Sequence, residues 1–138
     1  MNNRFKFRVW DKITNQYLQE LGIYYWHIPY SLDGEEITGE ANLVGLSELL
    51  KHDNFVTQQY TGLNDSNDDP IYEGDILKNH YDVGNNIIGQ VLYESDYGGF
   101  IFQWKRRGQD YKITNLNCDV AFESVIVGNI LENPELLK

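Results

Sequence analysis

Two neighbouring stretches decide the fold of this chain: Tyr60-Thr61-Gly62-Leu63 and Ile71-Tyr72-Glu73-Gly74-Asp75-Ile76-Leu77. We expect the first to end a strand, with Leu63 anchoring the following turn in the core. The second begins the return, and Gly74-Asp75 predicts a bend or bulge where a barrel strand changes direction. Gly89-Gln90-Val91 then begins a further strand, as small barrels pair a Gly-Asp strand with a Gly-x-Val strand.

The chain beyond this bend continues as short strands separated by turn signals. Phe100, Phe102 and Trp104 alternate with other residues and predict one buried face. We expect further strands at 71–78, 87–93, 100–105, 111–114 and 123–130, separated by Gly-rich or polar turns such as Gly98-Gly99 and Arg107-Gly108. Strands at this spacing predict a small antiparallel barrel or sandwich.

The N-terminal part adds more strands and one helix. Alternation predicts a strand over 4–10, and further strands are expected over 17–21, 23–30 and 55–60. Four leucines at helical spacing predict a short helix near 43–52, with Ser47 as its cap. Asn133-Pro134 predicts a terminal helical turn. The fold class is therefore mainly β, or α+β overall.

Length and composition favour one domain. The chain has 138 residues, of which 41% are hydrophobic, so it can bury a core without disulfides. We expect a single domain over 1–138, with N-terminal strands and a helix over 1–54 and the barrel over 55–138.

Charge and cysteine content restrict the partners and the compartment. The net charge is −10, which repels phosphate backbones at long range and makes general nucleic-acid binding an unfavoured function. Cys118 is the single cysteine, which excludes an intrachain disulfide and favours a reducing compartment. No apolar run reaches the roughly 18 residues of a membrane helix, and no signal peptide is evident. We expect a cytoplasmic protein without membrane contact.

The most metal-like stretch is Asp65-Ser66-Asn67-Asp68-Asp69. Asp65, Asn67 and Asp69 match the first ligands of a calcium loop, but Pro70 and Ile76 occupy positions that need Gly and Glu. The favoured interpretation is a polar turn whose Asx side chains bond local backbone. We predict no metal and no cofactor.

No set of residues forms a coherent catalytic group. The histidines, His27, His52 and His80, share no metal-ligand or catalytic spacing. Cys118 lacks a local partner and is interpreted as a small buried or half-buried thiol. Glu73 and Asp75, with Glu94, would pair as carboxylates only in an extended strand lining a sugar-sized cleft. The sequence predicts no catalytic residues, so an enzyme is the least favoured class.

One basic cluster breaks the acidic pattern of the second half. Lys105-Arg106-Arg107-Gly108 follows an aromatic strand, a pattern that weakly indicates contact with nucleic acid. Lys6 and Arg8 of the first strand would extend the patch if the fold brings them near. The commoner interpretation is a charged hairpin tip that protects a strand edge.

Three blocks of sequence resemble the YopX family of phage and prophage proteins. They are Lys6 to Asp11, then Gln59 to Asp65 with Ile71 to Leu77, and finally Val127 to Ile130 with Glu132 to Leu137. The blocks follow the family's order and span nearly the whole chain. One departure is the turn Asn67-Asp68-Asp69-Pro70, where the family often carries Asn-Gly.

The resemblance implies an SH3-like barrel in the C-terminal part and self-association, but it supplies no activity and no catalytic residues to transfer. Motif residues are predicted to act as architecture, namely Trp10, Tyr60, Gly62, Leu63, Tyr72, Gly74, Asp75, Gly128, Asn129 and Pro134. The first hypothesis is a non-enzymatic phage accessory protein that forms a homo-oligomer and contacts a phage or host protein. The alternatives are a nucleic-acid-associated small barrel and an acidic protein that mimics DNA.

Overall fold

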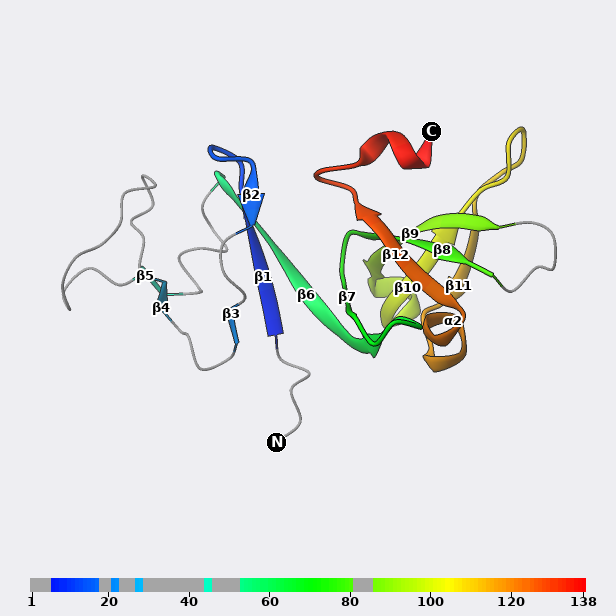
Figure 1. Ribbon diagram of the computed structural model, residues 1–138, viewed down its shortest axis with the longest axis horizontal. Coiled ribbons are helices and arrows are strands. Elements are labelled where there is room, and N and C mark those ends of the chain that lie inside the picture. The colour runs from blue at the N-terminus through cyan, green and yellow to red at the C-terminus, as the bar shows by residue number, and fades with distance from the viewer. Residues whose placement is uncertain (1–5, 18–20, 23–26, 29–43, 46–52, 81–85) are drawn as a thin grey trace. The chain divides into compact units, whose positions relative to one another are not determined.

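The computed structural model describes residues 6–17, 21–22, 27–28, 44–45, 53–80 and 86–138, and it is mostly β (Figure 1). Its strands are β1 (Lys6–Asp11), β2 (Gln16–Tyr17), β3 (Leu21–Gly22), β4 (His27–Ile28), β5 (Val44–Gly45), β6 (Phe55–Asn64), β7 (Pro70–Tyr72), β8 (Asp75–Asn79), β9 (Ile87–Glu94), β10 (Gly99–Trp104), β11 (Lys112–Asn115) and β12 (Ser124–Asn129). Its helical segments are η2 (Ser95–Tyr97), α2 (Cys118–Phe122) and η3 (Pro134–Leu137).

The chain divides into two compact units, Met1–Gln59 and Tyr60–Lys138. This division falls five residues from the predicted change at 54/55, within β6 rather than before it. β6 pairs with β1 through Phe55–Gln59 and with β7 between Tyr60 and Asn64. That the whole chain acts as one domain stays a prediction.

In the N-terminal unit, β1 pairs antiparallel with β2, β3 and β6. Val9, Trp10 and Phe55 are buried. Because the consecutive residues Val9, Trp10 and Asp11 are all buried, the alternation predicted for the first strand does not extend to its end. The predicted return strand over 17–21 is observed as β2 and β3, between which 18–20 lie outside the described residues. β4 pairs with β5, so Val44–Gly45 is a strand where the helix near 43–52 was expected to begin. Residues 46–52 of that helix lie outside the described residues.

The C-terminal unit contains a curled antiparallel sheet of order β11-β10-β9-β8-β12. Alternate residues of each strand point to opposite faces, and buried side chains lie on both, since the neighbours Ile76 and Leu77 are each fully buried. The core cluster consists of Ile71, Leu77, Val91, Phe102 and Ala121. Each large apolar side chain buried in this way contributes about 1.5–3 kcal/mol. The prediction of a small, mainly antiparallel β-barrel is therefore confirmed.

Glycines allow the closest approaches in this sheet. Gly89 lies where β9 meets β10, and a Cβ there would come 2.5 Å from the Gln103 carbonyl oxygen and from the Phe102 ring. Gly74, between β7 and β8, has φ of 85° and donates its N–H to the Val91 carbonyl at 2.8 Å. The predicted bend at Gly74-Asp75 is therefore a turn with a left-handed glycine.

A five-residue helix, α2, connects β11 to β12 and was not predicted from the sequence. Asn117 caps it, with its side-chain oxygen accepting from the Val120 N–H at 3.0 Å. Ala121 points into the core. Because the helix buries only this one side chain, it lacks the repeating apolar face that reveals longer helices.

The chain ends in η3, with Pro134 opening the predicted helical turn. Asn133 is the N-cap residue of that turn, but its side chain makes no cap bond. Its Oδ1 instead accepts from the Asn129 N–H at 3.4 Å. Among the described residues, no helix is long and apolar enough to cross a membrane.

Candidate functional site

The basic cluster lies at the tip of the β10–β11 hairpin, where Lys105, Arg106 and Arg107 are all exposed. Gly108 adopts φ of 77°, and the Gln109 N–H donates to the Arg106 carbonyl at 2.9 Å, which closes the turn. Lys105 Nζ lies 5.0 Å from the centroid of the Tyr111 ring. At this distance the ammonium and the ring attract each other.

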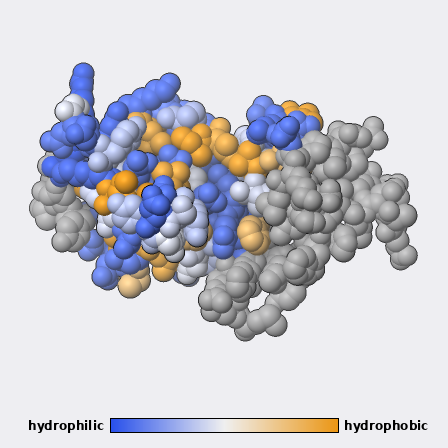
Figure 2. Space-filling view, turned by 180° about the vertical axis from the view of Figure 1, so that it is seen from behind, coloured by the Kyte–Doolittle hydropathy of each residue, from blue (hydrophilic) through white to orange (hydrophobic). Residues whose placement is uncertain are grey.

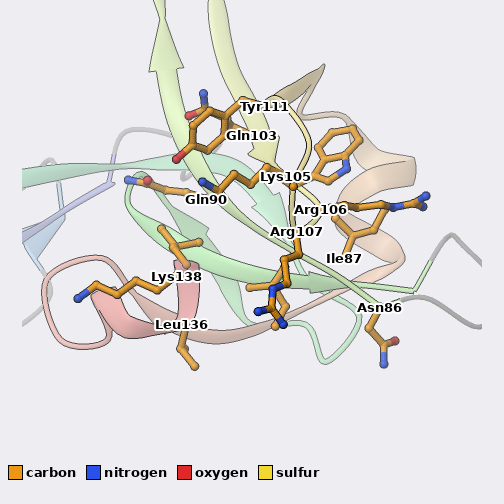
Figure 3. Close-up of a pocket in the computed structure, with 14 residues that line it drawn as sticks. Asn86, Ile87, Gln90, Gln103, Lys105, Arg106, Arg107, Tyr111, Leu136 and Lys138 are labelled. Atoms are coloured by element: carbon orange, nitrogen blue, oxygen red, sulfur yellow. The ribbon is translucent and has the colours of Figure 1, made fainter.

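This tip forms one wall of a groove of about 920 Å³ in the C-terminal unit (Figure 3). β9 and β10 supply its floor, and η3 with Lys138 supplies the other side. The described lining residues are Asn86, Ile87, Ile88, Gln90, Gln103, Trp104, Lys105, Arg106, Arg107, Gly108, Tyr111, Leu136, Leu137 and Lys138. We call this site the basic groove.

The charge of the basic groove opposes that of the chain. Four of its described lining residues are Lys or Arg, and none of those described is Asp or Glu. The chain as a whole carries 11 basic and 21 acidic residues. The sequence identified three of the four cations, and it missed Lys138 because η3 is distant in sequence. Gln90 and Gln103 were also missed, although alternation places them opposite the buried Val91 and Phe102.

A second hollow, of about 580 Å³, lies beside α2. Phe122 lines it and remains 76% exposed. Apolar side chains share this lining with Asp119 and Glu123, so the hollow has an acidic rim. We call this site the Phe122 hollow. In Figure 2, apolar side chains likewise gather among hydrophilic ones on the face that is shown.

The acidic turn is held together by its own backbone. Asp65 is 5% exposed, and its Oδ1 accepts from the N–H groups of Asn67 and Asp69, each at 2.9 Å. Its Oδ2 accepts from the Ile126 N–H, also at 2.9 Å. The predicted Asx turn is therefore observed at Asp65. The described residues contain no group of three or more side chains arranged to hold a metal.

The condition for a carboxylate pair at Glu73 and Asp75, one extended strand that carries both, is not met. Asp75 is 1% exposed, and its Oδ2 accepts from the Tyr72 N–H at 2.8 Å. Glu73 lies in the turn between β7 and β8, so the two residues do not share one extended strand. Glu94 Oε1 accepts from the Asp96 N–H at 3.4 Å as the cap of η2.

The remaining candidates for chemistry are His80, Cys118, His52 and His27. His80 is exposed, and its Nδ1 lies 3.0 Å from Asn86 Oδ1. Cys118 was expected to be a buried or half-buried thiol, and this expectation is wrong: it is exposed at the start of α2, with its Sγ 3.9 Å from Asp119 Oδ1. His52 lies outside the described residues, and His27 is described only as part of β4.

The two basic residues of the first strand have a local environment in the N-terminal unit. Arg8 Nε donates to Gln58 Oε1 at 2.7 Å, and its guanidinium lies 4.5 Å from the Tyr17 ring centroid. Tyr17 OH donates to the same Gln58 oxygen at 2.8 Å. This network explains Arg8 without a ligand. Lys6 pairs with Gly22 across β1 and β3.

The motif residues near the bend lie at strand junctions. The Tyr60 and Tyr72 rings are 5.7 Å apart, and Leu63 packs against the core cluster. Gly62 has φ of 85°, beside the irregular pairing of β6 with β7. In the N-terminal unit, Trp10 is 5% exposed.

The C-terminal motif joins the bend through backbone hydrogen bonds. Asn129 pairs with Asp75 across β12 and β8, and the Ile130 N–H donates to the Gly74 carbonyl at 2.8 Å. A Cβ at Gly128 would lie 2.6 Å from Asn133 Oδ1. The motif blocks Ile71 to Leu77 and Val127 to Ile130 therefore meet at the turn between β7 and β8.

Comparison with known proteins defines the class of this chain. A model of the YopX protein family matches residues 6–138, and the chain belongs to the YopX family. Its fold is similar to the crystal structure of protein EF1440 from Enterococcus faecalis, with a TM-score of 0.57 and 24% identity, covering 96% of this chain and 97% of that one. No curated protein matches the sequence.

Proposed function

We propose that this YopX-family chain is a phage-type accessory protein that acts through protein–protein contact, including contact between its own copies, and not through catalysis. It would act in the host cytoplasm on a phage or host partner. The observation that carries the proposal is Phe122, which is 76% exposed at the edge of an apolar hollow. Contiguous exposed apolar surface is typical of sites of protein contact, and Phe122 adjoins the apolar part of the lining of the hollow.

The chemistry of the Phe122 hollow fits a protein partner. Its floor contains Phe102, Trp104 and Val120, which would accept an apolar side chain. Asp119 and Glu123 at the rim favour a partner with basic residues around that side chain. The buried carboxylates of Asp65 and Asp75 accept backbone hydrogen bonds, so both act in the architecture.

Light scattering coupled to size-exclusion chromatography tests self-association. We expect the mass to exceed that of a monomer and to fall on dilution. Phe122→Ser removes a large apolar contact, which at the centre of an interface costs about 2 kcal/mol or more. The dissociation constant should therefore rise roughly 30-fold. Tyr97→Ser is the matched control, since Tyr97 is 53% exposed in η2 and does not line the hollow. A strict monomer at all concentrations would contradict the self-association.

A further inference from the structure

We infer that the basic groove binds single-stranded nucleic acid, with its cations on phosphates and Tyr111 stacked against a base. This inference is independent of the proposed function, because Phe122 does not line the groove. The acidic chain as a whole disfavours nucleic acid, so binding would be confined to this one surface.

Charge separation is the first support. Lys105, Arg106, Arg107 and Lys138 line one concavity in a chain of net charge −10. Like charges that line one space repel one another, which favours a ligand of opposite charge there. A phosphate chain would neutralise them, because arginine and lysine both bind phosphate oxygens through charge-assisted hydrogen bonds.

The aromatic ring is the second support. Tyr111 is 61% exposed, so its ring is open to a ligand in the groove. Lys105 Nζ lies 5.0 Å from its ring centroid, so a cation and a π-face are presented together (Figure 3). Proteins that bind single strands combine these two groups, the cation for the backbone and the ring for a base.

The floor of the groove provides the third support. Gln90 and Gln103 are paired neighbours on β9 and β10, and both line the groove. An amide carries donors and an acceptor, so it can meet any base edge without demanding one sequence. Leu136 and Leu137 add apolar surface on the η3 side.

Shape favours a single strand over a duplex. A protein reads duplex DNA by inserting a convex helix or ribbon into the major groove. Here the protein surface is concave and holds about 920 Å³, near the upper range of small-ligand sites. Bases in a duplex are stacked on each other, so they cannot offer a face to Tyr111.

Fluorescence anisotropy with a labelled oligo-dT of about 12 nucleotides tests the inference, since single-strand sites span about 4–16 nucleotides. If each of the four cations meets one phosphate, log K against log salt should have a slope of about −2.8. Affinity should then fall roughly 50-fold between about 50 and about 200 mM salt. No binding at the lower salt overturns the inference.

Substitutions distinguish oligo-dT binding at the groove from nonspecific electrostatic attraction to the protein. Arg107→Glu should weaken oligo-dT binding at least tenfold and make the salt slope shallower by about 0.7 or more. Lys12→Glu is the matched control, because Lys12 is exposed in the N-terminal unit and does not line the groove. Equal weakening by the two variants overturns the inference. Urea unfolding should be unchanged in both, since each side chain is exposed.

Tyr111 distinguishes stacking from charge. Tyr111→Ala should weaken oligo-dT binding about tenfold, whereas Tyr111→Phe keeps the π-face and should retain it. A duplex of the same length should bind more weakly and be insensitive to Tyr111→Ala. If the duplex binds equally well, or a poly-glutamate peptide competes as strongly as oligo-dT, the groove is a site for polyanions or acidic protein segments and the inference fails.

Discussion

The acidic turn Asp65–Pro70 and the basic tip Lys105–Gly108 are both clusters of charge, but the fold uses them in opposite ways. In the acidic turn, the Asp65 carboxylate is buried and accepts three backbone hydrogen bonds. In the basic tip, Lys105, Arg106 and Arg107 are exposed around a groove. A charged cluster is therefore architectural where its carboxylate is buried and bonded to backbone N–H groups, as at Asp65.

The largest effect should come from removing the partner of those groups. Asp65→Ala leaves three N–H groups without their acceptor, two of them in the turn and one in β12. We expect the free energy of unfolding to fall by about 3 kcal/mol, measured by urea denaturation. Asp69→Ala is the control and should cost less than about 0.5 kcal/mol, because that side chain is exposed. A loss below about 1 kcal/mol for Asp65→Ala would contradict the architectural role of the acidic turn.

A smaller effect should be shared by both regions. Gly62, near the acidic turn, and Gly108, in the basic tip, have φ of 85° and 77°, and a Cβ at either position would meet open space. Each Gly→Ala change should therefore cost only the strain of a left-handed backbone, about 1–2 kcal/mol. Thermal or urea unfolding of the two variants checks this. A much larger loss at one site would mean that its turn carries more than local geometry.

The smallest effect concerns pH near the acidic turn. Burial raises the pKa of the Tyr60 phenol above its ordinary value, and the Asp68 carboxylate raises it further. Tyr60 OH donates to Asn64 Oδ1 at 2.6 Å, a bond that needs the proton. Because the folded state holds this proton more tightly than the unfolded state does, the contribution to stability is complete below the unfolded pKa. It is lost as pH rises through the folded pKa.

Asp68→Asn should lower the pKa of Tyr60, and NMR titration of ring-labelled tyrosine measures it. Asp96→Asn, an exposed change in η2, serves as the control. An unchanged Tyr60 titration in Asp68→Asn would show that burial alone sets the pKa.

The strands of the C-terminal unit could be predicted because their signal is local. Phe102 and Val91 alternate with groove-facing residues, and Gly74 marks the bend by its own conformation. α2 escaped prediction because five residues with one buried alanine have no helical period. The full groove escaped because its residues come from 86–90, 103–111 and 136–138, and only the fold brings these segments together.

The function could be predicted less completely than the fold. Three of the four cations stood out as a run, whereas Lys138 gave no local signal. Phe122 could not be distinguished from a core aromatic, since burial depends on what the rest of the chain covers. Its 76% exposure follows from its place at the end of α2, whose inward residue is Ala121.

The single thiol of this chain has a practical consequence for work at the bench. Cys118 is solvent-accessible on α2, the helix that also carries Phe122. In air-equilibrated buffer, two molecules can become linked through these sulfur atoms, and such a covalent pair would have the mass of a dimer without any native affinity. Measurements of assembly therefore need a reductant or a Cys118→Ser background, and the same atom offers one defined point for attaching a fluorophore.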